Sequence, residues 1–364
     1  MADVIASDYR LSPEGELTRF AAAVLEKAGV AAEDARIAAD VLVAADLRGV
    51  ASHGVARLAG DVASLRERVI EAKPEVRTVR ESPTSLLVDA GNGLGPPVAK
   101  RTMERILAKA AERGAAFGAV RNSNDFGIAG YYAMMALEHD MIGIVSTNAV
   151  RDVVPTFGRD VLLGPNPLAF AIPAKNEPPF VLDFATTTVQ RGTLDAHDRN
   201  GTPLAAGWAV DEHGAETLDP RAARNGALLP LGGYGVDNGG HKGYGLGLLV
   251  DILCGVFAGG AFGLDLPLRG DEPKPSAISH FFAAFTIAGF RDPEQFKADM
   301  DAELRAFKDS EKAAGHERIY VAGELEHEKT LFNREHGVPV HVVVWERLRT
   351  LAGELGVPFD IERR

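Results

Sequence analysis

The sequence feature that most constrains the fold is a buried strand that comes late in the chain. Residues 279–285, Ser-His-Phe-Phe-Ala-Ala-Phe, are a largely apolar run that predicts a buried strand. The run follows a strongly apolar helix expected at residues 246–257 and an acidic, proline-rich loop at residues 264–276. Because strands and helices alternate irregularly before it, this strand must return to a sheet that earlier strands have built. We therefore expect an α/β fold with a mixed sheet instead of a regular doubly wound one.

The remaining segments supply the other layers of the fold. Strands are expected at residues 84–89, 115–120, 141–147 and 180–184, helices at residues 96–111, 126–139 and 293–314, and a short strand and turn at residues 321–324. Near the N-terminus, apolar spacing predicts one helix that starts at Ser12-Pro13 and a second at residues 32–47. This all-α unit is too small to bury much by itself, so we expect it to pack on another subunit or on the other end of the chain.

The composition of the 364 residues is that of a globular enzyme, with 46% hydrophobic and 25% charged residues. A net charge of −12 argues against nucleic-acid partners. The sequence has no run of about 18 apolar residues, so no membrane span is expected, and its polar, acidic N-terminus does not resemble a signal peptide. The single cysteine, Cys254, excludes an intramolecular disulfide and indicates a reducing, cytoplasmic location.

Residues 121–132, Arg-Asn-Ser-Asn-Asp-Phe-Gly-Ile-Ala-Gly-Tyr-Tyr, combine a strand end, a polar turn and a helix start. Small residues in the first turn of a helix leave its backbone N–H groups open to a ligand. Asp125 stands at the mouth of this turn. It is either the N-cap of the helix, a position that favours aspartate, or a functional carboxylate.

Ser52, His53 and Arg57 form a second candidate site. Ser52 is a plausible N-cap, and a helix that begins at Gly54 would place His53 and Arg57 near each other on one face. An arginine fork can hold a substrate carboxylate while an imidazole passes a proton to the adjacent carbonyl. The alternative is an exposed helix start with an unrelated surface arginine.

Three further residues are candidates. Lys242 lies in the glycine-rich segment 239–245, where a close backbone approach and a helix start would suit a cofactor pyrophosphate or a substrate carboxylate; a flexible turn with a surface lysine is the alternative. Asp183 ends a buried strand before three threonines, and it could hold a ribose hydroxyl or a nicotinamide amide, or cap a turn. His280, among three phenylalanines, is expected to be a core histidine.

The sequence lacks the common cofactor and metal motifs. Residues 91–95 read G-x-G-x-G, not the G-x-G-x-x-G of a dinucleotide fingerprint, so we expect a glycine turn between a strand and a helix. The ten histidines show no spacing typical of a metal site, and there is neither a nucleophile elbow nor a P-loop.

Six motifs occur in the order seen in the type 2 malate/L-lactate dehydrogenase family, which the chain resembles from about residue 15 to residue 355. The motifs are SHGVARL at 52–58, RNSNDFGIAGYY at 121–132, GPNPLAFAIP at 164–173, DFATT at 183–187, GGHKGYGLGLLVDIL at 239–253 and AGELE at 322–326. That family also includes ureidoglycolate and sulfolactate dehydrogenases, diketogulonate reductase and piperideine-carboxylate reductase. The resemblance implies an NAD(P)-dependent dehydrogenase acting on a CH–OH group of a small 2-hydroxy acid, malate-like or lactate-like.

The resemblance also implies an architecture. Members of this family bind NAD or NADP on a non-Rossmann, largely antiparallel mixed sheet, which would correspond to residues 77–292. A helical domain for dimerisation and substrate binding would come from both chain ends, residues 1–76 and 293–364. Members are usually homodimers.

Site residues follow from the resemblance, motif by motif. The catalytic residues would be His53 as proton donor, Arg57 as the grip on the substrate carboxylate, and Asp125. Ser52 and Asn122 would join Arg57 in binding the substrate. The cofactor contacts would be Asn148, Asp183, Phe184, Ala185, His241, Lys242, Gly323 and Glu324.

One departure from the family pattern concerns Asp125. The family motif usually reads N-S-x-H-F-G, and its histidine serves as an acid or base in several members. An aspartate has an ordinary pKa of ~3.9, against ~6.5 for a histidine, so it would need burial or a nearby negative charge to donate a proton at neutral pH. Three outcomes stay open: Asp125 orients a proton-carrying His53, serves a cationic substrate such as a cyclic imine, or marks a cofactor-binding protein with impaired catalysis. A second departure, Phe157-Gly158-Arg159, adds a positive charge.

Overall fold

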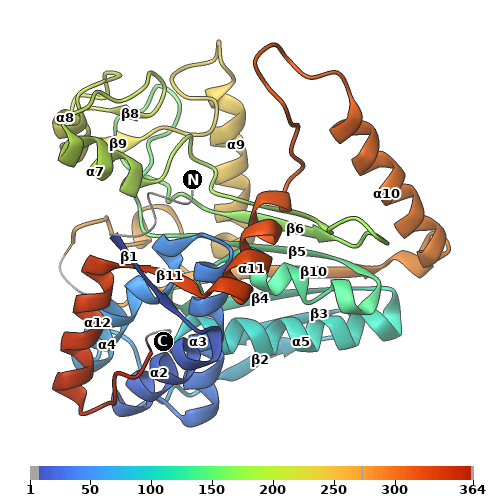
Figure 1. The fold of residues 1–364 in the computed structure, drawn as a ribbon, viewed down its shortest axis with the longest axis horizontal. Coiled ribbons are helices and arrows are strands. Elements are labelled where there is room, and N and C mark those ends of the chain that lie inside the picture. Colours follow the sequence, from blue (N-terminus) through green and yellow to red (C-terminus); the bar gives the residue numbers. More distant parts are fainter. Residues whose placement is uncertain (1–7, 272–273, 362–364) are drawn as a thin grey trace.

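The computed structural model describes residues 8–271 and 274–361, and a seven-stranded sheet lies at its centre (Figure 1). The strands of this sheet are β2 (Arg77–Glu81), β3 (Ser85–Asp89), β4 (Ala115–Ser123), β5 (Met141–Thr147), β6 (Leu168–Ile172), β7 (Phe180–Phe184) and β10 (Ile278–Thr286). Their spatial order is β2-β3-β4-β10-β5-β6-β7. Only β3 and β4 run parallel, and every other neighbouring pair in this sheet is antiparallel. The expected mixed, largely antiparallel sheet is therefore confirmed.

The late strand β10 occupies the middle of this sheet. Phe282 lies opposite Gly118 of β4 on one side and Val145 of β5 on the other. Phe282 and Ala284 are buried in the core on one face, whereas the preceding Phe281, which points to the other face, meets the ring of Phe257. This alternation shows why an apolar run was needed here, because both faces of a central strand are covered.

Helices cover the two faces of the sheet. Helix α5 (Gly95–Arg113) follows the glycine turn after β3 and leads to β4, and it shares one face with α6 (Ala129–Met134). The opposite face of β10 carries the π-helical turn Ile252–Val256, which continues α9 (Gly240–Asp251). Cys254 is fully buried in that turn, as expected of a small hydrophobe, and burial raises the pKa of its thiol to about 12.

The two ends of the chain pack together beside the sheet (Figure 1). They contribute β1 (Tyr9–Ser12), α2 (Glu14–Lys27), α3 (Ala32–Leu47), α4 (Leu58–Arg66), β11 (Val338–His341) and α12 (Val342–Leu355). Strand β1 pairs with β11, and one apolar core joins Leu17 near the N-terminus to Trp345 near the C-terminus. The N-terminal helices therefore bury their apolar stripes against the other end of the chain, one of the two expected partners.

The remaining elements are α7 (Arg191–Asn200), β8 (Ala209–Val210), α8 (Pro220–Asn225), β9 (Ala227–Leu228), α10 (Pro293–Asp309), α11 (Glu324–His336), and short 3-10 turns that include Ala51–His53, Val55–Arg57 and Leu137–His139. Several predicted boundaries were wrong. The helix expected from residue 126 begins at Ala129, because Gly127 has a φ of 82° and Phe126 is buried against the ring of His280. The helix expected from Gly54 begins at Leu58, after two 3-10 turns.

Two predicted boundaries near the C-terminal half also differ. The glycine-rich segment before α9 belongs to its first turns, because glycines 240 and 243 pack directly on backbone, where a Cβ would clash. The strand expected at residues 321–324 is a turn into α11, a helix that the sequence pattern missed. Helix α10 ends at Asp309, five residues before the expected end.

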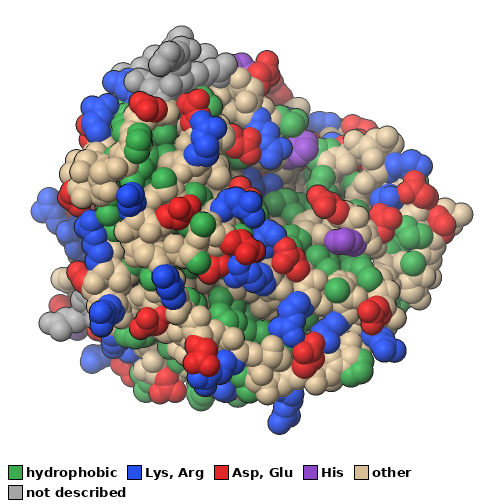
Figure 2. All heavy atoms as spheres, turned by 90° about the horizontal axis from the view of Figure 1, so that it is seen from below, with side chains coloured by type: hydrophobic (Ala, Val, Ile, Leu, Met, Phe, Trp, Pro, Cys, Tyr) green, Lys and Arg blue, Asp and Glu red, His purple; other side chains and the backbone are tan. Residues whose placement is uncertain are grey.

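Acidic and basic side chains are interspersed on the face seen from below (Figure 2). Many charged side chains of the described residues are paired, for example Arg101 with Asp34 at 2.6 Å. Among the described residues, no helix has the length and apolar character needed to cross a membrane.

Candidate active site

A cavity of about 760 Å³ gathers most of the predicted site residues. Its wall includes Ser52, His53, Arg57, Asp125, Asn148, Asp183, Phe184, Ala185 and Gly323. These residues come from the 3-10 turns before α4, from the loop after β4, from the end of β5, from β7 and its C-terminal end, and from the turn before α11. The fold thus joins residues that lie as far apart in the sequence as 52 and 323.

Asp46 of α3 holds the turn that carries His53 and Arg57 by a hydrogen bond to its backbone. Asp46 is 4% exposed, and its Oδ2 accepts a hydrogen bond of 2.8 Å from the Val55 N–H. Gly54 lies directly on this carboxylate, since a Cβ there would sit 1.9 Å from Oδ1. Burial raises the pKa of Asp46 to about 7, although the Val55 N–H lowers it. Asp46 therefore positions the segment between the histidine and the arginine.

Arg57 and Asp125 form an ion pair across the cavity wall, with 3.3 Å between Nη2 and Oδ2. The Asp125 carboxylate raises the pKa of the guanidinium, and burial opposes it. Burial would raise the pKa of Asp125, but Arg57, His53 and the Gly127 N–H together hold it below its ordinary value. Asp125 is consequently ionised at neutral pH and only accepts hydrogen bonds.

Asp125 is not the helix N-cap. Its Oδ1 accepts a 2.9 Å hydrogen bond from the Gly127 N–H, two residues ahead, and the helix starts two residues later at Ala129. The residue at the cap position is Ile128, which makes no side-chain capping bond. The capping alternative for Asp125 is therefore wrong, and its carboxylate faces Arg57.

A second cavity of about 670 Å³ adjoins the first and shares Arg57 and Asp125 with it. Asp61 lines this second cavity, and burial raises its pKa to about 6. The charge of Arg57 lowers this pKa, and the charge of Asp125 raises it. Arg57 therefore lies near two carboxylates, and burial, aided by the charge of Asp125, makes Asp61 the one that is easier to protonate.

On the other wall of the larger cavity, Asp183 faces the start of α6. Its Oδ2 accepts a 2.7 Å hydrogen bond from the Gly130 N–H. Burial raises the pKa of Asp183, while Gly130, Arg48 and His53 oppose the shift. Asn148 is buried, and its side chain is engaged by Asp251 and by the Ser279 N–H.

Four predicted residues lie outside the cavity lining. His241 and Lys242 lie in the first turn of α9, where Lys242 borders a separate hollow. Asn122 donates a 3.1 Å hydrogen bond to Asp89, where the C-terminal ends of β4 and β3 lie side by side. Glu324 is 5% exposed and engaged in ion pairs.

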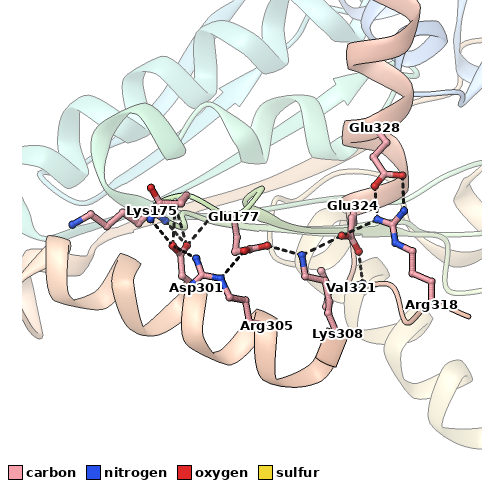
Figure 3. A network of polar contacts seen from close by, with 10 residues as sticks. Lys175, Glu177, Asp301, Arg305, Lys308, Arg318, Val321, Glu324 and Glu328 are labelled. Carbon is pink, nitrogen blue, oxygen red and sulfur yellow. Dashed lines mark hydrogen bonds and ion pairs between the residues drawn. The ribbon is translucent and has the colours of Figure 1, made fainter. Parts of the chain in front are cut away.

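The ion pairs of Glu324 belong to a network that joins three segments of the chain (Figure 3). Glu324 accepts from Lys308 of α10 at 3.2 Å and pairs with Arg318 at 2.9 Å. Lys308 also pairs with Glu177, in the turn between β6 and β7. This network anchors the start of α11 to α10 and to the sheet, and so supports Gly323 at the cavity wall from behind.

Sequence reasoning missed several residues of this site. Gln190, Arg48 and Glu326 line the larger cavity, and Asp46 supports it from the core. Gln190 lies three residues after the DFATT motif, and this proximity was the one available signal. Asp46 is eight residues from Gly54 on another element, and no sequence spacing connects the two.

His280 is a core histidine, as expected. Its Nδ1 lies 2.8 Å from Thr147 Oγ1, its Nε2 lies 3.0 Å from Ser123 Oγ, and its ring stacks on Phe126. Burial lowers its pKa to about 3, so the ring is neutral. Arg159, from the second sequence departure, is exposed and lines neither cavity.

Comparison with known proteins supports the expected enzyme class. The malate/L-lactate dehydrogenase family profile matches residues 13–349. Malate dehydrogenase from Pyrococcus abyssi is 41% identical over 354 residues, covering 97% of each chain. L-sulfolactate dehydrogenase from Methanocaldococcus jannaschii is 37% identical over 350 residues, covering 96% of this chain and 98% of the relative. The solved structure of malate dehydrogenase from Pyrococcus horikoshii superposes with a TM-score of 0.89 at 40% identity, covering 97% and 98%.

The fold, the site and these matches define an NAD(P)-dependent dehydrogenase that acts on a CH–OH group. The chain belongs to the malate/L-lactate dehydrogenase family. The expected family, enzyme class and nicotinamide cofactor are thereby confirmed. The roles of individual residues remain predictions.

Proposed function

We propose that this enzyme interconverts a small, malate-like 2-hydroxy acid and its 2-oxo acid at the larger cavity. The observation that carries the proposal is that His53 and Arg57 line one cavity while Arg57 is held by Asp125 at 3.3 Å. Arg57 would bind the C1 carboxylate, since a guanidinium can bind two carboxylates with different N–H groups. His53 would take the proton of the hydroxyl group, or return it to the carbonyl oxygen.

The ionised state of Asp125 argues against Asp125 as a proton donor and is compatible with two of the roles left open by the sequence, the orienting role and the service of a cationic substrate. A carboxylate whose pKa lies below its ordinary value has no proton to donate at neutral pH. His53 would therefore carry the proton alone, and Asp125 would orient Arg57. Asp61 would relieve the crowding of negative charge by taking up a proton near pH 6 when the substrate carboxylate arrives.

The donor set of the larger cavity fits a nicotinamide dinucleotide. Alanines and glycines, including Ala129, Ala185 and Gly323, leave the wall open to a flat ring. Arg48 offers a positive charge for a phosphate, and Asp183 and Glu326 offer acceptors for ribose hydroxyls. When bound, the nicotinamide accepts or supplies the hydride. His241, Lys242 and Glu324 remain predicted contacts without support from the cavity lining.

A cyclic imine reductase is the second candidate, and the same carboxylate favours it. An ionised Asp125 beside the cavity would stabilise an iminium cation that Arg57 holds by its carboxylate. The two candidates differ in the substrate charge at C2, which is zero for an oxo acid and positive for an iminium. A panel of 2-oxo acids and cyclic imino acids, assayed with NADH and NADPH, separates them.

We infer that the enzyme is a homodimer. An apolar stripe of α9 and its π-helical extension is exposed in the single chain, with Leu248, Ile252 and Val256 at intervals of four residues and between 37% and 51% exposed. Association of two copies through this face would bury it. The division into a cofactor domain at 77–292 and a helical domain from both chain ends, and the cytoplasmic location, stay predictions. Analytical ultracentrifugation that finds a monomer at micromolar concentration would refute the dimer.

The experiment that tests the function is a malate-dependent reduction of NAD⁺ or NADP⁺ by the purified enzyme. We expect turnover that His53→Ala reduces by at least about a hundredfold, the usual contribution of a general base. Cofactor binding without turnover of any oxo acid or imine would instead indicate a binding protein with impaired catalysis. In that case Asp125→His, which restores the usual family residue, should create activity, whereas in a functional site it should reduce activity.

A further inference from the structure

We propose that Gln190, acting through Ser52, determines which ring nitrogen of His53 carries the proton. Gln190 would be a positioning residue, because it touches the histidine only through the serine hydroxyl. The direction of the expected kinetic effect rests on the proposed function, whereas the tautomer itself does not.

With the Gln190 amide oxygen facing Ser52, as the structure places it, the hydrogen bonds allow one arrangement. Ser52 Oγ lies 3.3 Å from Gln190 Oε1 and 3.0 Å from His53 Nδ1. The amide oxygen only accepts, so the single hydroxyl proton is donated to Gln190. The serine oxygen then presents a lone pair to Nδ1, which must carry a hydrogen to complete the second bond. Nε2 is therefore the bare nitrogen of the neutral ring.

This tautomer suits proton transfer in both directions. A neutral His53 with a bare Nε2 can accept the proton of a substrate hydroxyl. The imidazolium that results carries hydrogens on both nitrogens, and its Nδ1–H keeps the same bond to Ser52. Without Gln190, the serine hydroxyl is free to donate to Nδ1, which places the hydrogen of the neutral ring on Nε2 and blocks it as a base.

Gln190 is held in place for this task. It precedes α7, yet its side chain makes no capping bond to the helix. The next residue, Arg191, pairs with Asp152 with 3.0 Å between Nε and Oδ2, and its Nη1 donates to the Ala223 carbonyl at 2.9 Å. These contacts fix the backbone from which the Gln190 side chain reaches Ser52.

The charged groups that face His53 do not replace this contact. Asp125 and Asp183 act on the ring through space, from the loop after β4 and from the end of β7. Within residues 8–271 and 274–361, Ser52 is the side chain that hydrogen-bonds to the ring. Neither carboxylate hydrogen-bonds to the ring, so the two carboxylates do not select between the neutral tautomers.

The direct test is the tautomer, measured by NMR on enzyme labelled with ¹⁵N-histidine at alkaline pH. The His53 signals are assigned by their loss in His53→Ala. We expect the Nδ1–H tautomer in the wild type, a shift towards Nε2–H in Gln190→Ala, and the wild-type tautomer in Gln190→Glu, whose carboxylate also only accepts. Gln295→Ala, which removes an exposed glutamine of α10, is the matched control. An unchanged tautomer in Gln190→Ala overturns the proposal.

The kinetic test compares pH profiles. In Gln190→Ala, hydroxy acid oxidation at alkaline pH should fall about fivefold, as expected for the loss of one neutral hydrogen bond of ~1 kcal/mol. Oxo acid reduction at acidic pH should be unchanged, because the imidazolium has both hydrogens. Ser52→Ala should match this loss, and the double variant should add nothing. A change in KM alone would make Gln190 a substrate contact and overturn the proposal. If no substrate turns over, the proposed function fails, and NMR still decides on Gln190.

Discussion

Replacing Asp46 by asparagine should make the protein more stable at alkaline pH and leave its site intact. The Asp46 carboxylate is 4% exposed, and burial raises its pKa from 3.8 to about 7. The folded protein therefore holds a proton on Asp46 that the unfolded chain releases above pH 4. Between about pH 4 and pH 7 the wild type loses stability as the pH rises, since the unfolded state binds fewer protons there.

The size of the effect follows from the shift. The rise of the Asp46 pKa from 3.8 to about 7 corresponds to about 4 kcal/mol, at ~1.4 kcal/mol per pH unit. At pH 8, ionisation of the buried Asp46 lowers the unfolding free energy of the wild type by at most this amount. This is a large part of the 5–15 kcal/mol that is ordinary for a domain. An amide at position 46 cannot ionise, and its oxygen can still accept the Val55 N–H. A constant cost of about 1–3 kcal/mol, from an amide N–H without a partner, would not depend on pH.

Urea unfolding between pH 5 and pH 8, followed by the fluorescence of the buried Trp345, measures the prediction at fixed protein concentration. The difference between Asp46→Asn and wild type should grow in favour of the variant by about 1.4 kcal/mol per pH unit up to pH 7 and then level off. Glu26→Gln, which changes an exposed carboxylate on α2, should stay within about 0.5 kcal/mol of the wild type. A difference that does not change with pH would refute the buried carboxylate as a source of instability.

Three further substitutions test other groups. Arg57→Lys should raise KM for the acid substrate about tenfold or more, because an ammonium lacks the bidentate fork; an unchanged KM in steady-state kinetics would contradict the carboxylate-binding role. Asp125→Asn should lower kcat/KM about tenfold, as Arg57 loses its charged partner; a higher kcat/KM would show that the carboxylate opposes catalysis. His280→Gln should reduce the loss of unfolding free energy between pH 7 and pH 4.5. In the wild type, burial lowers the His280 pKa from 6.5 to about 3, so protons bind the unfolded chain and stability falls below pH 6.5. Urea unfolding of both proteins at pH 7 and pH 4.5 measures this, and parallel losses would refute it.

The sequence predicted the strands of the sheet better than the helix ends. Apolar runs such as residues 141–147 and 180–184 gave strand limits that match β5 and β7. The inner strand β5 is mostly apolar because both of its faces are covered, and the edge strand β7 still has apolar residues at four of five positions, so the limits of both are visible in composition. Helix starts depend on which backbone groups find partners. Phe126 is buried against His280, so α6 begins only at Ala129, and the local sequence spacing does not predict this contact.

Some of the site was visible in the sequence because its residues stand in short motifs. His53 and Arg57 lie in one short segment, and Asp183, Phe184 and Ala185 lie in another. Residues of one short segment stay close together in the fold, so each group lines the cavity together. Residues that act from a separate element gave no comparable signal. Gln190 reaches Ser52 across 138 positions.

The sequence by itself determined the family, the mixed sheet with a late buried strand, and the unusual aspartate at position 125. These depend on residue type and order, which are local properties. Only the tertiary structure decided the charge state of that aspartate, because the charge state of a carboxylate depends on its neighbours in space. Arg57, 68 positions earlier in the chain, lies 3.3 Å from Asp125 and keeps it ionised. The same packing buries Asp46 and raises its pKa to about 7, so the pKa values of two aspartates of one sequence shift in opposite directions.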